Sequence, residues 1–161
     1  MKKLILTLSI LLITIISYGQ HQTISVNGIE LDKKYTQSQI YNILGTPKSI
    51  KPNEFDAWYS RYYYNNSSFA FGHEDWDLLA FTIKDTTYKV NNYLTVGMHS
   101  DSIKAMKGYL IEDIDDDTIY MYWAPSKEYR DNVAYIQIII NKHTKIIKMI
   151  SLLTVKFHDY Y

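Results

Sequence analysis

The residues best suited to acid–base chemistry lie in one short segment, His73-Glu74-Asp75-Trp76-Asp77. An imidazole beside carboxylates is able to ligate a metal ion or move protons. Five consecutive residues point in several directions, however, whereas a metal site gathers ligands from separated positions. An envelope hydrolase stays the weakest alternative, because catalytic groups can converge from distant parts of a fold. We assign no catalytic residue.

The sequence has none of the common motifs for metal binding, nucleophilic catalysis or phosphate binding. None of the other histidines, which are His21, His99, His143 and His158, has the spacing that places two ligands on one helical face. No Gly-x-Ser-x-Gly elbow or phosphate-binding glycine loop occurs. With no cysteine, the chain has no thiol nucleophile, no thiolate zinc site and no disulfide framework. We therefore expect no cofactor.

The densest acidic run spaces Asp113, Asp115 and Asp117 as at the start of a calcium-binding loop. Thr118 stands where that loop requires its turn glycine, and Ala124 stands where it requires a bidentate glutamate. The sequence thus predicts no metal site here. We expect a solvated acidic connection between a helix and a strand.

Aromatic side chains dominate residues 58–64, which make up nearly all of the predicted strand Ala57–Tyr64. Strand alternation divides them into two sets, Trp58, Ser60, Tyr62 and Tyr64 on one face and Tyr59, Arg61 and Tyr63 on the other. One face can be core, and the other then presents tyrosine and arginine to water or to a partner. These residue types are enriched at binding hot spots, because they cover a large area at small entropic cost.

A second aromatic segment, Tyr120 to Trp123, repeats this pattern. The predicted binding residues are Trp58, Tyr59, Arg61, Tyr62, Tyr63, Tyr64, Tyr120, Tyr122 and Trp123. The leading interpretation is a non-catalytic module that binds another protein with an aromatic sheet face. The same chemistry suits stacking on sugars, so a cell-surface glycan-binding module is the second interpretation. The third interpretation is that the tyrosines are only good strand formers, which pack across strands and have no binding function.

Two short helices must accompany the strands. Thr36 and Gln39 form a capping box, after which Ile40, Ile43 and Leu44 make one apolar stripe that ends at Gly45. The second helix begins near Ser100, carries Ile103 and Met106 at the same spacing and stops at Gly108. We expect both glycines to adopt a left-handed backbone. Helices this short are unstable alone, so each must pack on a sheet.

Most of the chain is predicted to be extended, since Ile, Val, Tyr, Phe and Trp fit a half-buried pleated surface. Turn-forming clusters at 65–67, 84–87 and 141–144 separate the strands, and the last two read as tight hairpins. The predicted strands are Thr23–Val26, Ala57–Tyr64, Ser68–Phe71, Leu78–Ile83, Thr118–Trp123, Val133–Ile140 and Lys145–Val155.

The two helices are the evidence for an internal duplication. A shift of 63 positions places Leu31 on Leu94, Ile40 on Ile103, Ile43 on Met106 and Gly45 on Gly108. We therefore predict an α+β fold made of two tandem repeats, each a short helix packed on an antiparallel β-meander. The repeats, about 27–90 and 91–158, share one compact domain over 20–161 because no flexible linker separates them.

Tyr35 to Pro47 and the aromatic meander after it resemble the tandem-repeat proteins of the beta-lactamase-inhibitor type. The chain is also similar to small outer-membrane assembly lipoproteins of the SmpA/OmlA kind, and Val96 to Gly108 resembles the same helix motif. The resemblance implies an α+β fold that binds other proteins without catalysis. It carries over no inhibitory loop residue, and this chain has no cysteine for a lipid anchor.

The N-terminus predicts export. Lys2 and Lys3 precede an apolar stretch from Leu4 to Ile16, and small residues at Ser17 and Gly19 favour cleavage before Gln20, so residues 1–19 form a signal peptide. That stretch is short for a stable membrane span. Its removal leaves 15 basic against 17 acidic residues, a charge of −2, which argues against nucleic acid as a partner. We expect a protein partner in the envelope or outside the cell, in a periplasmic or secreted setting.

Overall fold

The computed structural model describes residues 24–31, 33–52, 59–105, 109–125 and 133–153. For residues 104–105, 109–114, 121–125, 133–135 and 153 the backbone alone is described. The signal segment, Trp58, Met106 and Gly108 lie outside the described residues. Within the described part of the chain, no helix combines the length and the apolarity that a membrane crossing requires.

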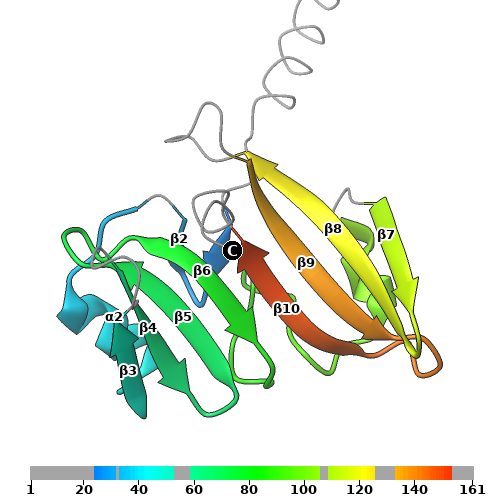
Figure 1. Ribbon diagram of the computed structural model, residues 1–161, viewed down its shortest axis with the longest axis horizontal. Helices are drawn as coiled ribbons and strands as arrows, with labels where there is room; N and C mark the ends of the chain where they lie inside the picture. The colour runs from blue at the N-terminus through cyan, green and yellow to red at the C-terminus, as the bar shows by residue number, and fades with distance from the viewer. Residues whose placement is uncertain (1–23, 32, 53–58, 106–108, 126–132, 154–161) are drawn as a thin grey trace, which may run out of the picture.

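One large antiparallel sheet organises the chain, and its strand order is β3-β4-β5-β6-β10-β9-β8-β7. Two runs of four consecutive strands meet where β6 pairs with β10, and Figure 1 shows them side by side. Together with helix α2, this sheet confirms the predicted α+β class. The sheet strands are β3 Ser49–Pro52, β4 Tyr59–Tyr64, β5 Ser67–Gly72, β6 Leu78–Ile83, β7 Tyr109–Ile114, β8 Asp117–Pro125, β9 Val133–Asn141 and β10 Ile147–Leu153.

Helix α2 (Gln37–Leu44) begins with the predicted capping box. The Gln39 backbone N–H donates to Thr36 Oγ1 at 3.3 Å, and the Thr36 N–H donates to Gln39 Oε1 at 2.8 Å. At its end Gly45 has φ 86° and ψ −172°, a region that only glycine adopts readily. The φ is positive as expected, but the predicted left-handed helical conformation is wrong, because that conformation has a ψ of about 47°. Ile40 and Leu44 are buried, but Ile43 is 38% exposed, so its predicted place in the core stripe is wrong.

The second predicted helix is a 3₁₀ helix, η1 (Ser100–Ala105). Its Ile103 is 5% exposed and joins the same core as Ile40 of α2. A two-strand hairpin, β1 (Ser25–Val26) and β2 (Ile29–Glu30), adds Val26 and Ile29 to that core. The main core therefore lies between one sheet face and a layer made of these short elements.

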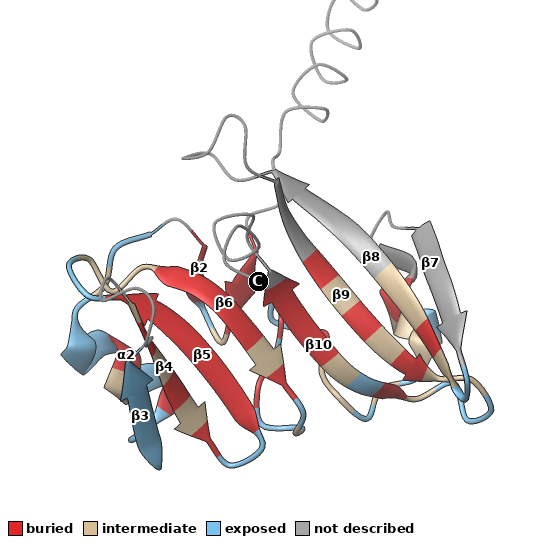
Figure 2. Ribbon diagram, in the orientation of Figure 1, coloured by how far each residue is buried: buried red, intermediate tan, exposed pale blue. Residues whose placement is uncertain are grey.

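The inner sheet strands supply the other half of the core. Phe69, Phe71 and Phe81 are fully buried in β5 and β6, and Ile136 and Ile138 are buried in β9. Figure 2 shows buried residues running through β5, β6, β9 and β10, whereas all four residues of β3 at the sheet edge are exposed. Burial thus increases from the β3 edge toward the centre of the sheet.

Several predicted connections differ from the structure. The predicted hairpin at 84–87 is wrong, because β6 pairs with β10 and the chain after β6 buries Tyr88, Val90 and Leu94 in the core. The hairpin at 141–144 is confirmed between β9 and β10. The acidic run is also corrected: residues 112–114 belong to β7, and Asp115 and Asp116 form the tight β7–β8 turn.

Candidate binding surface

Strand β4 settles which aromatic face is core. Ser60, Tyr62 and Tyr64 are buried, while Tyr59, Arg61 and Tyr63 lie on the opposite face and are half-buried. We call these last three side chains the outer row. The alternation predicted from the sequence is therefore present, and the structure assigns each set to its side of the sheet.

Tyr62 and Tyr64, two of the predicted binding residues, belong to the core. The Tyr62 ring lies 5.7 Å from Phe71 and 5.4 Å from Trp76, and the Tyr64 ring lies 5.6 Å from Phe69, between ring centroids. Burial raises the pKa of both phenols, and nearby Tyr41 adds to the rise. Side chains held this way serve packing and do not present a surface to a partner.

The predicted residues of the second aromatic segment are placed only in part. Tyr120 is half-buried, pairs with Ile138 and packs against the main core. Tyr122 and Trp123 pair in backbone register with Ile136 and Tyr135, and their side chains lie outside the described residues. The outer row is thus the described part of the predicted surface.

Small residues lie beside the outer row. Across the ladder, Tyr59, Arg61 and Tyr63 face Gly72, Ala70 and Ser68 of β5. Ala70 packs with Leu79 and Ala80 in a small second cluster, against which Tyr59 lies. The side chains of the outer row consequently lie beside small residues of β5 and β6 that are themselves buried. Sequence patterns did not predict which small residues lie beside the outer row, because cross-strand register decides it.

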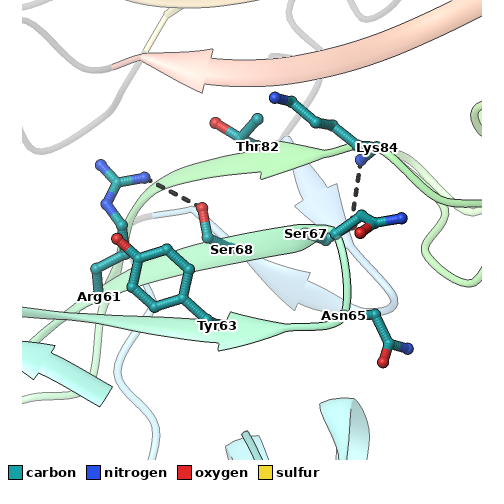
Figure 3. A pocket seen from close by; sticks show the side chains of 8 residues that line it. Arg61, Tyr63, Asn65, Ser67, Ser68, Thr82 and Lys84 are labelled. Carbon is teal, nitrogen blue, oxygen red and sulfur yellow. Dashed lines mark hydrogen bonds between the residues drawn. The ribbon is translucent and has the colours of Figure 1, made fainter. Parts of the chain in front are cut away.

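A cavity of about 370 Å³ opens at the turn end of this face. Figure 3 shows side chains from β4, β5 and β6 around it, among them Arg61, Tyr63, Asn65, Ser68, Thr82 and Lys84. Arg61 Nη1 donates to Ser68 Oγ at 3.2 Å, which holds the guanidinium beside β5. Every described residue that lines the cavity is polar, and none of them is acidic. The sequence analysis predicted Arg61 and Tyr63 as binding residues but not Lys84. Lys84 lies directly after β6, and only the pairing of strands brings it to the cavity.

The His73 segment forms the β5–β6 turn and has one contact of chemical interest. Ser60 Oγ lies 2.7 Å from His73 Nε2. Ser60 is 6% exposed on the core side of β4, however, so its hydroxyl is poorly placed to meet a substrate. Asp75 instead pairs with Lys34, with Nζ–Oδ2 at 2.6 Å. Among the described residues, no group of three histidine or carboxylate side chains is arranged to hold a metal ion.

No family model and no curated protein matches this sequence. Among solved structures, the chain is similar to an extracellular protein containing an SCP domain from Bacillus anthracis, with TM-score 0.46 and 10% identity over 78% of this chain and 46% of that one. It is also similar to a cysteine-rich secretory protein from Staphylococcus aureus, with TM-score 0.44 and 13% identity over 77% of this chain and 45% of that one. The chain spans less than half the length of either, and likeness at this level carries no argument about function.

Proposed function

We propose that this chain is an exported, non-catalytic protein-binding module that engages its partner with the outer row. One observation carries the proposal: Tyr59, Arg61 and Tyr63 lie on the sheet face opposite the main core. Tyrosine and arginine contribute binding energy well, because each covers a large area and keeps a polar tip for hydrogen bonds. Tyr59 is anchored against the buried cluster of Ala70, Leu79 and Ala80, which holds one end of the outer row in place.

The strand order supports the part of the proposal that concerns duplication. In each half a short helix, α2 or η1, precedes four consecutive antiparallel strands, and the two runs meet through their last strands. We propose that the halves are tandem repeats, as in the binding proteins that the helix motifs resemble. The outer row belongs to the first repeat.

Export is the part of the proposal that rests on sequence alone. The positively charged start, the apolar stretch and the small residues before Gln20 support cleavage by a signal peptidase. Exported material should begin at Gln20 or at its cyclised form, as determined by mass spectrometry of the N-terminal peptide. Membrane-bound material that keeps Met1 would contradict export by cleavage.

Binding is tested by retention of a partner from an envelope fraction on the immobilised exported protein. The test variant changes Tyr59→Ser and Tyr63→Ser, and the control changes Tyr93→Ser, which removes a 37% exposed tyrosine that is not part of β4. The proposal expects one protein that the wild type and the control retain and the double variant loses. A partner held equally by all three chains would contradict use of the outer row. Retention of an oligosaccharide in place of a protein would favour the glycan-binding alternative.

A further inference from the structure

The outer face of the sheet, to which the outer row belongs, carries a small second core. Ala70 of β5 and Leu79 and Ala80 of β6 form one cluster on this face, and they are 0%, 3% and 1% exposed. Neighbouring strands lie about 4.8 Å apart, so the side chains of a sheet stand beside an alanine and leave its outward side open. Water is therefore kept from this cluster by groups that lie over it.

The burial continues into the strand that pairs with β6. Ser151 of β10 is 4% exposed, and alternation turns it to the outer face, because Ile150 and Leu152 on either side of it belong to the main core. Ser151 pairs with Thr82 of β6. The covered area of the outer face thus reaches from β5 through β6 to β10.

The described elements outside the sheet pack on its other face. Helix α2, η1 and the β1–β2 hairpin place their buried apolar residues in the main core. In the described part of the chain, Tyr59 of β4 is the partly buried apolar side chain that packs against the cluster. It reaches the cluster from one side, so the rest of the cover comes from another part of the chain.

The chain after β10 begins beside the cluster. The antiparallel pairing of Leu152 with Phe81 brings the end of β10 level with Ala80. Eight extended residues span up to about 26 Å at ~3.3 Å per residue. The strands β6 and β5 lie within about 10 Å of β10, so residues 154–161 are long enough to cross both. Half of these eight residues are apolar or aromatic, namely Val155, Phe157, Tyr160 and Tyr161.

We propose that residues 154–161 fold back over the outer face and bury the cluster of Ala70, Leu79 and Ala80. Val155 and Phe157 are the side chains that pack on it, because alternation in an extended chain turns these two residues to one side. The inference goes beyond the proposed function, since it concerns how the chain covers its own sheet. A partner that engages the outer row would meet this segment beside it.

The test uses thiol labelling, since the chain has no cysteine of its own. Leu79→Cys places a thiol in the cluster, and cysteine is smaller than leucine, so the substitution leaves a cover undisturbed. Deletion of residues 154–161 should increase the rate at which a water-soluble maleimide labels this thiol by about tenfold or more. Ser49→Cys in the exposed strand β3 is the control, and its labelling rate should be the same with and without the segment.

A second variant keeps the length of the chain. Val155→Ser with Phe157→Ser should also increase the labelling rate of the thiol at position 79, because serine does not pack on an apolar cluster. This variant decides the question if the deletion unfolds the protein, which urea denaturation of each variant shows. An unchanged labelling rate in a folded form of either variant would overturn the proposal.

Two other occupants of the outer face are outcomes of the same experiment. Labelling that becomes faster when the full chain is diluted would show that a second copy covers the cluster. Labelling that becomes faster in Phe55→Ser with Trp58→Ser, but not in the variant of Val155 and Phe157, would assign the cover to the segment before β4. Either result would overturn the proposal.

Discussion

Asn27 and Asn91 make the same pair of hydrogen bonds between residues 25–27 and residues 89–91. The Asn27 N–H donates to Lys89 O at 2.9 Å, and the Lys89 N–H donates to Asn27 Oδ1 at 2.7 Å. The Asn91 N–H donates to Ser25 O at 2.9 Å, and the Ser25 N–H donates to Asn91 Oδ1 at 2.9 Å. Each contact maps onto the other by a shift of 64 residues, with the bridge between Val26 and Val90 at the middle.

This symmetry predicts equal sensitivity at the two positions. Asn27→Ala and Asn91→Ala should each lower the free energy of unfolding by about 1–2 kcal/mol, because a side-chain acceptor is lost and alanine fits a positive φ poorly. The observed φ values are 47° and 50°. Urea denaturation measures the effect. Asn→Asp at either position keeps an acceptor and tolerates this φ, so it should cost less than half as much, and a neutral Asn91→Ala would contradict the account.

Tyr64 offers a test of core energetics, because its buried hydroxyl finds no hydrogen-bond partner among the residues that the structure describes. Tyr64→Phe removes that unpaired group, so the free energy of unfolding should stay equal or rise by up to about 1 kcal/mol. Tyr35→Phe is the matched control: the Tyr35 hydroxyl accepts from the Glu30 N–H at 2.7 Å, and its loss should cost about 1 kcal/mol. A clear loss of stability in Tyr64→Phe would show that its hydroxyl is paired.

The core tyrosines also predict a loss of stability in alkali. Burial raises the pKa of Tyr62, Tyr64 and Tyr88 above the ordinary value of 10.0. Above about pH 10 the unfolded chain therefore releases protons that the folded chain keeps, and stability falls as pH rises. Phenolate absorbance should show these groups ionising together with unfolding. Tyr64→Phe should make the decline shallower, and a stability that is flat up to about pH 11 would contradict the burial of these phenols.

Local sequence rules predicted the parts of the fold that depend on neighbouring residues. Thr36 and Gln39 formed the capping box as expected, and alternation along β4 separated Tyr62 from Tyr63 correctly. Both features are fixed within a few residues of chain. The acidic turn at Asp115 and Asp116 was misread as a helix–strand connection, because β7 before it was not recognised as a strand.

Features that depend on distant residues were not predictable from pattern alone. β3 has the lysine and proline content of a loop, and only pairing with β4 makes it a strand. The chain at 84–87 has turn chemistry, yet the true partner of β6 is β10, more than sixty residues later. Lys84 joins Arg61 for the same reason, since cross-strand register brings β4 and the end of β6 to one cavity.

The most direct test of the outer row is the dissociation constant of the retained partner for three forms of the exported protein: wild type, Tyr59→Ala with Tyr63→Ala, and the control Tyr93→Ala. The account predicts that the double variant binds at least about tenfold more weakly while its urea midpoint shows that it is folded, and that the control binds like the wild type. A folded double variant with wild-type affinity would contradict the account, and Tyr59 and Tyr63 would then be strand-forming residues only.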